Sequence, residues 1–431
     1  MDFMNQKYIP DDAIYEVAKH INSRNNKQSN IPIITVDDNS ETPHYFEIIP
    51  FDEIDNTRIK FFAVDGSYNS QEFYNGLSVG IYTAGYICYE NGNQIRINNL
   101  DDPVILGKGY FPKNILITND EHLEAVYDEL IELKPVSELI KFFDRGNDQI
   151  FSFNKQLICS SISKLLSFCQ EILEWALIFE ISNLDIISEN DFILKDGTLK
   201  SNNINSELLI KLGKHVKNKK INLVAVTKNS PIKLELSSTF KNIDNYLQDQ
   251  LKPTYPFKTD NPRWRKLCCW FEVPDSILVF AYPEASQRRE FIKGTIETIT
   301  KTSMYAKKEL KGSRGFGIFF VSRLDYVEKL QNYDWTVIDL NIFDVMPEIE
   351  IGNKKRDINK IQEIFYELTR LTQEHYILGY PYPLVEAHNF VTLKKDFKEE
   401  IIKRVKYSLY KEQMMDNVDI ENLFLDIHDR F

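Results

Sequence analysis

The sequence predicts an α/β fold in which a mixed β-sheet is flanked by helices. Strand-like runs come first in the chain, and strand and helix patterns then alternate. Apolar residues make up 43% of the 431 residues, which is enough for a large core and unlike a disordered chain. Consecutive strands followed by β/α alternation are typical of a mixed sheet with helices on both faces.

The chain divides into three predicted parts. Residues 1–50 predict an N-terminal accessory segment, because residues 11–26 have the pattern of a short helix followed by a polar loop. Residues 51–400 predict the main domain, and residues 401–431 predict a C-terminal helical tail.

Three consecutive strands open the main domain. The apolar run IKFFAVD at 59–65 has strand length and ends in Asp65. A second run at 75–92 is rich in Tyr, Val and Ile, and the Asn91–Gly92 pair predicts a hairpin turn into a strand at 93–99.

Helices and strands alternate in the rest of the domain. An apolar-periodic segment at 153–182 predicts a central helix, which leads to the strand FILKD at 192–196. The remaining predictions are helices at 119–133, 205–218, 240–251, 357–376 and 393–413, and strands at 221–228, 266–273, 276–284 and 314–322.

Charge and cysteine content exclude several classes of protein. The formal net charge of −12 argues against a protein that coats nucleic acid by bulk electrostatics, although basic clusters at 211–220, 306–314 and 353–356 leave room for a local groove. Five Cys without a C-x-x-C pair fit neither a disulfide framework nor a zinc ribbon. With no signal-peptide pattern and no membrane-length apolar run, we expect a cytoplasmic protein.

Two strand ends carry the same chemistry. Asp65 and Asp196 each follow an apolar run and precede a Gly, and carboxyl ends of strands are where α/β sheets place ligands. An isolated Asp-Gly pair is an ordinary turn, but its repetition in one context favours a shared site. Two neighbouring carboxylates coexist as anions if a divalent cation such as Mg²⁺ or Mn²⁺ lies between them.

Further candidates lie on helices and strand ends. The central helix offers Glu171, Glu174 and Glu180 as a third acid, with Glu180 more typical of a solvated stripe. The segment GYPYPLVEAHNF contains Tyr380 and His388, and a His there can serve a metal, a proton transfer or the fold alone. The possible phosphate contacts are Lys228, which ends another strand, and the paired Arg288 and Arg289.

In combination these motifs resemble the NurA family of nucleases. The pieces are FAVDGSY, QEILEWALIF before FILKDGTL, AVTKNS and YPYPLVEAH, in the family's order from Asp65 to His388. The resemblance implies an RNase H-like fold and a metal site of Asp65, Glu174, Asp196 and His388, with Tyr380 and Lys228 beside it. Glu171 is the second choice for the helix acid.

The resemblance also implies a function. It suggests a Mn²⁺-dependent deoxyribonuclease that acts on DNA ends as a homodimer, together with a HerA-type hexameric ATPase, in DNA end resection or antiviral defence. The alternative is a DNA-clamping or translocase-docking subunit with weak or silent nuclease activity. That alternative draws on an apolar stripe in the acidic tail, formed by Ile420, Leu423, Phe424 and Ile427. A glycosidase built on paired carboxylates is disfavoured, because a third acid and a strand-end Lys accompany the pair.

Overall fold

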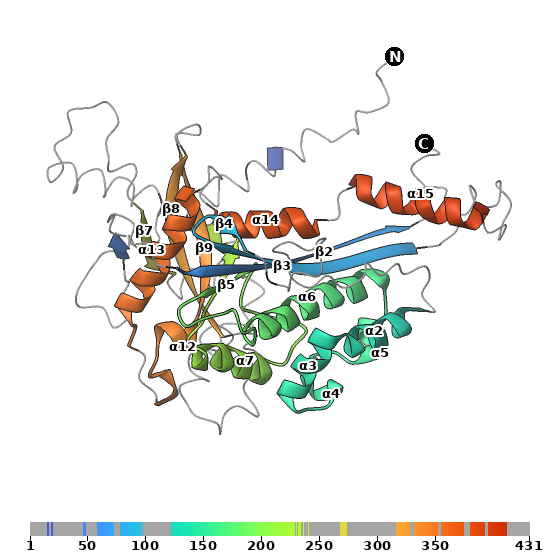
Figure 1. Cartoon of the computed structure of the whole chain (residues 1–431), viewed down its shortest axis with the longest axis horizontal. Helices are drawn as coiled ribbons and strands as arrows, with labels where there is room; N and C mark the ends of the chain where they lie inside the picture. Colours follow the sequence, from blue (N-terminus) through green and yellow to red (C-terminus); the bar gives the residue numbers. More distant parts are fainter. Residues whose placement is uncertain are drawn as a thin grey trace, which may run out of the picture.

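A mixed β-sheet of nine strands forms the centre of the described part of the chain in this computed structural model (Figure 1). The strand order is β1-β7-β8-β9-β6-β5-β2-β3-β4. The structure describes residues 46–48, 58–72, 78–95, 97, 122–228, 268–273, 316–327, 332–351, 355–374, 380–392 and 395–411, and the single residues 15, 16, 19, 230, 232, 233, 236 and 240.

One half of the sheet holds three antiparallel strands followed by two parallel ones. β2 (Lys60–Glu72), β3 (Ser78–Glu90) and β4 (Asn93–Gln94) form the antiparallel part. β5 (Phe192–Asp196) runs parallel to β2, and β6 (Asn222–Thr227) runs parallel to β5. This arrangement confirms the predicted α/β class with an RNase H-like mixed sheet.

The predicted hairpin turn is confirmed. Asn91 and Gly92 both have positive φ, 49° and 74°, which is the geometry that favours Asn-Gly between antiparallel strands.

The prediction that the first strand ends at Asp65 is wrong. β2 continues to Glu72, and Asp65 pairs with Gly85 in the middle of the ladder to β3. The parallel neighbour β5, by contrast, pairs with β2 only from Phe61 to Val64. Because β3 supplies hydrogen bonds along the whole length of β2, the chain has no reason to turn where β5 ends. Asp65 therefore lies at the point where one of its two neighbouring strands stops.

The other half of the sheet is antiparallel. β9 (Asn332–Asn341) pairs with β6 and joins the two halves, and β8 (Gly317–Val327) pairs with β9. β7 (Cys269–Glu272) and β1 (Phe46–Ile48) complete this edge. The predicted strands at 266–273 and 314–322 are confirmed, whereas the one at 276–284 lies outside the described residues.

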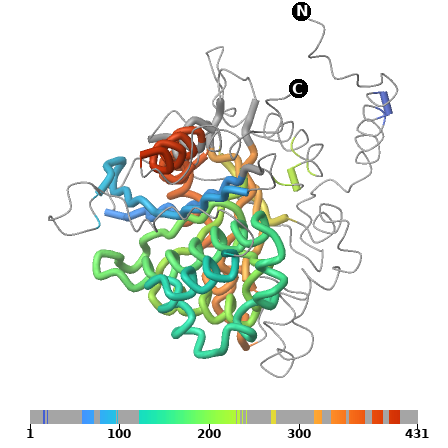
Figure 2. The backbone as a smooth tube through the Cα atoms, turned by 90° about the vertical axis from the view of Figure 1, so that its right-hand side faces the viewer, coloured from blue at the N-terminus to red at the C-terminus, as the bar shows by residue number. Residues whose placement is uncertain are grey.

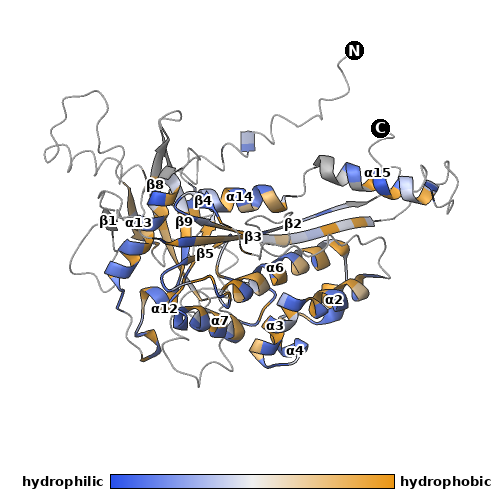
Figure 3. Cartoon of the chain, viewed as in Figure 1, coloured by the Kyte–Doolittle hydropathy of each residue, from blue (hydrophilic) through white to orange (hydrophobic). Residues whose placement is uncertain are grey.

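Helix α6 (Ile162–Ile181) covers β2 and β3 on one face, and α14 (Tyr382–Val391) covers them on the other (Figures 1 and 2). α6 is apolar on most sides (Figure 3), because α2, α3 and α5 pack against its outer surface. The segment predicted as one helix is broken before Ser161, whose side chain accepts a hydrogen bond from the backbone N–H of Lys164 and so caps α6.

The remaining helices surround this core. They are α2 (Leu123–Glu132), α3 (Lys134–Phe143), α4 (Asn147–Ile150), α5 (Lys155–Ile158), α7 (Ser206–Asn218), α12 (Ile342–Val345), the 3₁₀ helix η5 (Ile349–Ile351), α13 (Ile358–Glu374) and α15 (Lys395–Lys411). Within the described ranges, no helix has the length and apolar character that crossing a bilayer requires.

The predicted division into three parts stays a prediction. Most of residues 1–50 and residues 412–431 lie outside the described part of the chain, and α15 runs across residue 400.

The basic cluster at 211–220 is largely engaged with acidic partners. Lys214 forms an ion pair with Glu350, and Lys220 lies 2.8 Å from Glu189. Lys211 donates to the carbonyl of Phe142. These contacts indicate that the cluster stabilises the packing of α7.

Asp344 in α12 is a buried acid, and we expect its ionisation at higher pH to destabilise the fold. Its side chain is 4% exposed, Lys217 lies 3.6 Å away, and its Oδ2 atom has no hydrogen-bond partner among the described residues. Burial raises the pKa of Asp344 from 3.8 to about 6, against the opposing effect of Lys217. The acid therefore favours folding most below pH 3.8, and this contribution is lost as the pH rises through 6.

We expect Asp344→Asn to raise the free energy of unfolding at pH 8 by roughly 1–3 kcal/mol, and to change it little at pH 4. Urea unfolding at both pH values measures the difference. Asp128→Asn, which removes an exposed partner of Lys155, serves as a control and should change stability by less than about 1 kcal/mol. A variant less stable than the wild type at pH 8 would contradict the expectation.

Candidate metal centre

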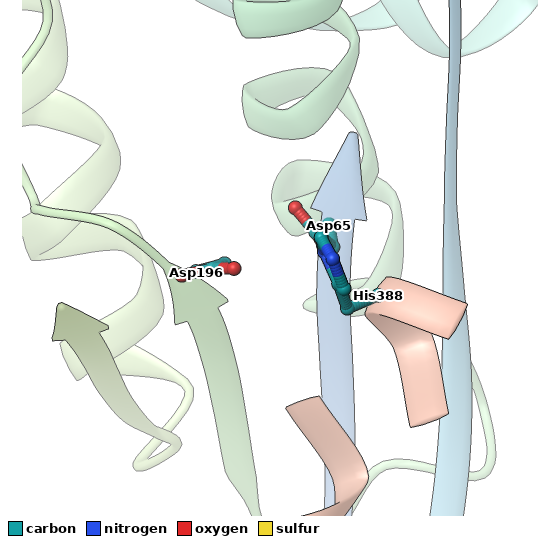
Figure 4. A group of neighbouring side chains, drawn as sticks. All are labelled: Asp65, Asp196 and His388. Carbon is teal, nitrogen blue, oxygen red and sulfur yellow. The ribbon is translucent and has the colours of Figure 1, made fainter. Parts of the chain in front are cut away.

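Three predicted site residues from distant parts of the chain meet at the end of β5 (Figure 4). Asp65 comes from the middle of β2, Asp196 from the last position of β5, and His388 from α14. One ligand atom of each lies within 4.8 Å of the others. Two carboxylates and an imidazole at this spacing can hold a metal ion.

Asp65 is the buried member of the cluster, with 4% exposure. Its Oδ1 accepts a hydrogen bond from the Gly66 N–H at 2.8 Å, and its Oδ2 lies 2.8 Å from Nδ1 of His388. Burial raises the pKa of Asp65 to about 6, with further contributions from the charges of Asp196 and Glu174. The His388 side chain is 47% exposed, so the cluster opens toward solvent on the side of α14.

Two of the other predicted residues, Lys228 and Tyr380, contact the Asp196 carboxylate. Lys228 donates to Oδ2 at 2.9 Å, and the Tyr380 hydroxyl lies 3.1 Å from Oδ1 and also 3.1 Å from the carbonyl of Val226. Burial and the Asp196 carboxylate raise the pKa of Tyr380 well above its usual value, so the phenol remains a donor. The structure thus brings Tyr380 and Lys228 to the site through Asp196.

Glu174 lies beside the cluster but outside the group of three. Its Oε1 accepts from Gln170 at 2.9 Å and its Oε2 accepts from Lys195 at 2.6 Å. It is close enough to Asp65 to raise the pKa of that acid. Its assignment as a metal ligand stays a prediction.

The other two helix acids face elsewhere. Glu171 accepts hydrogen bonds from Ser201 and Asn203, and so stabilises the segment after β5. Burial raises the pKa of Glu180, and the charge of Glu138 on α3 raises it further. Among the three candidates, therefore, Glu174 is the one beside Asp65.

Two residues of the site were missed by sequence reasoning. Gln170 bridges Glu174 and the carbonyl of Gly66, at 2.9 and 3.0 Å. Lys195 is 5% exposed and bonds Glu174. Burial alone would lower the pKa of Lys195, but Glu174 raises it above its usual value, so this lysine is charged. The available signal was a Lys inside an apolar strand, FILKD, which requires a buried partner.

Arg288 and Arg289 were predicted as phosphate contacts. Both lie outside the described residues, so their role stays a prediction.

The residues present fit a hard divalent cation. The carboxylates of Asp65 and Asp196 and the imidazole of His388 meet within 4.8 Å, and the Glu174 carboxylate lies beside them. Lys195 and Lys228 supply ammonium groups to Glu174 and Asp196. A divalent ion among such oxygen ligands offsets their mutual repulsion. Carboxylate and water ligands suit Mg²⁺ and Mn²⁺.

Comparison with known proteins adds three solved structures. The NurA nuclease from Sulfolobus solfataricus matches with 16% identity over 93% of this chain and 95% of its own, with a TM-score of 0.40. A second NurA structure matches with 11% identity, 95% and 99% coverage and a TM-score of 0.34. A NurA structure with manganese matches with 12% identity, 84% and 66% coverage and a TM-score of 0.21.

These structures bear the name of the family whose motifs the sequence resembles. Because the identities and TM-scores are low, the chemistry of the site has to be judged on its own residues. No family model and no curated protein sequence matches the chain.

Proposed function

We propose that the protein is a metal-dependent deoxyribonuclease that hydrolyses phosphodiester bonds with Mn²⁺ or Mg²⁺. The observation that carries this proposal is the meeting of Asp65, Asp196 and His388, whose ligand atoms lie within 4.8 Å of one another. The cluster lies where β5 ends, and its His388 side is open to solvent.

Each residue has a separate task in this proposal. Asp65, Asp196 and His388 would hold the ion, which would supply Lewis-acid chemistry for phosphodiester hydrolysis. Tyr380 fixes the orientation of Asp196 by its hydrogen bond to Oδ1. The Lys228 side chain is 36% exposed, so it can leave Asp196 and meet a backbone phosphate as a point charge.

The further parts of the proposal rest on the motif resemblance. They are action at DNA ends, a homodimer, and cooperation with a HerA-like hexameric ATPase in repair or antiphage defence. The alternative of a docking subunit with silent nuclease depends on the apolar stripe at 420–427, which lies outside the described residues. No described residue favours it, and the assay below separates it from an active nuclease.

We expect the wild type to cleave DNA in the presence of Mn²⁺, and Asp196→Asn to lose cleavage by about a hundredfold or more. The amide oxygen of the substituted side chain can still accept the hydrogen bond from the Tyr380 hydroxyl, but the side chain no longer offers a charged ligand to the metal. Release of labelled nucleotides from linear DNA, with and without Mn²⁺, measures the effect. The control is Asp185→Asn, which changes an exposed acid in the turn between α6 and β5 and should cleave like the wild type. A wild type without metal-dependent cleavage, alone or with its translocase, would leave the docking role as the better description.

A further inference from the structure

A buried ion pair lies on the α6 side of the candidate metal centre. Lys195 Nζ lies 2.6 Å from Glu174 Oε2, and the two side chains are 7% and 6% exposed. The same ammonium donates to the backbone carbonyl of Asp196 at 2.9 Å and lies 5.6 Å from the centre of the Trp175 ring. Lys195 therefore has partners on three sides, and one of them belongs to a proposed metal ligand.

The Glu174 carboxylate is equally constrained. Gln170 holds its Oε1 and also donates to the carbonyl of Gly66. Both oxygens of Glu174 thus have donors from the protein itself. Lys195 and Gln170 therefore set the position of Glu174.

The charges of the site count against a second divalent cation. Asp65, Asp196, Glu174 and the neighbouring Glu171 supply four carboxyl groups, and Lys195 and Lys228 supply two ammonium groups. One divalent ion offsets the excess of carboxylates over ammonium groups, and a second would add two more positive charges to a buried site. Two-metal sites hold their ions about 3.5–4 Å apart between shared carboxylates. The ammonium of Lys195 already lies between Glu174 and the backbone of Asp196.

We propose that Lys195 takes the place of a second divalent cation, so that the site binds a single Mn²⁺ ion. Lys195 is then a positioning residue, which holds Glu174 and supplies a fixed positive charge beside Asp196. Glu174 acts through this pair and not as a ligand of the bound ion, which differs from the ligand role that its place in the sequence predicts. The inference rests on the proposed metal-dependent function.

The number of Mn²⁺ ions per chain tests this inference without any measurement of activity. Equilibrium dialysis gives the count, and electron paramagnetic resonance distinguishes an isolated ion from a spin-coupled pair. We expect one isolated ion in the wild type. Lys195→Met frees Glu174 and should bind two coupled ions, whereas the double variant Lys195→Met/Glu174→Gln should return to one.

The outcomes separate this inference from the proposed function. Two coupled ions in the wild type, or one ion in a folded Lys195→Met variant, would overturn the role of Lys195 while leaving a metal-dependent nuclease intact. A wild type that binds no Mn²⁺ would overturn the proposed function itself. Lys195→Met leaves a buried acid without its ammonium partner, which destabilises the protein, so the fold of this variant is checked by circular dichroism. If it does not fold, the wild-type count still decides.

Discussion

Asp65→Asn is expected to lower the rate of Mn²⁺-dependent DNA cleavage by about a thousandfold. It should not destabilise the metal-free protein. Asn retains the shape of Asp, can still accept from the Gly66 N–H through Oδ1, and can donate to Nδ1 of His388. It removes a charge that lies close to Asp196 and Glu174. In the metal-free protein, loss of that charge relieves the repulsion among the carboxylates. In the Mn²⁺-bound protein, it removes a proposed ligand.

Two measurements on the same variant separate these effects. Single-turnover cleavage of linear DNA reports the loss of activity, and the melting temperature with and without Mn²⁺ reports the loss of binding. Mn²⁺ at a hundred times its dissociation constant should stabilise the wild type by about 2.7 kcal/mol and Asp65→Asn by much less. An Asp65→Asn variant with full activity, or with an undiminished Mn²⁺-induced stabilisation, would contradict the assignment of Asp65 as a ligand.

Gly66→Ala is expected to lower both stability and activity, because the site has no room for a methyl group. A Cβ at Gly66 would lie 2.6 Å from Cγ of Gln170 and 2.7 Å from Oε1 of Glu174. Glu174 cannot move freely, since Lys195 holds its other oxygen. We expect a loss of about 1–3 kcal/mol in the free energy of unfolding. A displacement of about 1 Å at the site would lower cleavage by up to about a hundredfold.

The matched control for this variant is Gly146→Ala. Gly146 precedes α4 with φ −68°, and no atom lies within 4 Å of an added Cβ. Gly146 is the N-cap of α4, so the restriction of the unfolded chain by Ala and its poorer fit at an N-cap oppose each other, and the change in stability is expected to stay below about 1 kcal/mol. Chemical denaturation of both variants gives the comparison. Equal stabilities for Gly66→Ala and Gly146→Ala would show that the contacts around Gly66 relax without cost.

The sequence predicted the strands of the sheet better than their ends. β3, β5 and β6 follow from apolar runs, and the Asn91–Gly92 turn follows from its dipeptide. The same reasoning ended β2 at Asp65, because Asp-Gly is a common turn. The local signal failed there because strand length depends on a partner, and β3 offers one as far as Glu72.

The roles of the two Asp-Gly pairs also differ for tertiary reasons. Gly197, after Asp196, has φ +100° and is needed for a turn. Gly66 continues an extended strand, and it is needed because the side chains of Gln170 and Glu174 pack against it. One dipeptide thus serves a backbone conformation at one position and a close side-chain approach at the other.

The chemical types of the site residues were determined by the sequence alone. The Asp-Gly repeat marked Asp65 and Asp196, and the segment GYPYPLVEAHNF marked Tyr380 and His388, so all four can be read from short local patterns. Their meeting depends on α14 crossing one face of the sheet while α6 crosses the other. Only the tertiary structure decided which helix acid lies beside Asp65. It also showed that Lys195 neutralises this acid. The physical reason is that a buried charge takes its role from its partners, and those partners, such as Gln170 and Lys195 around Glu174, converge only when helix and strand pack together.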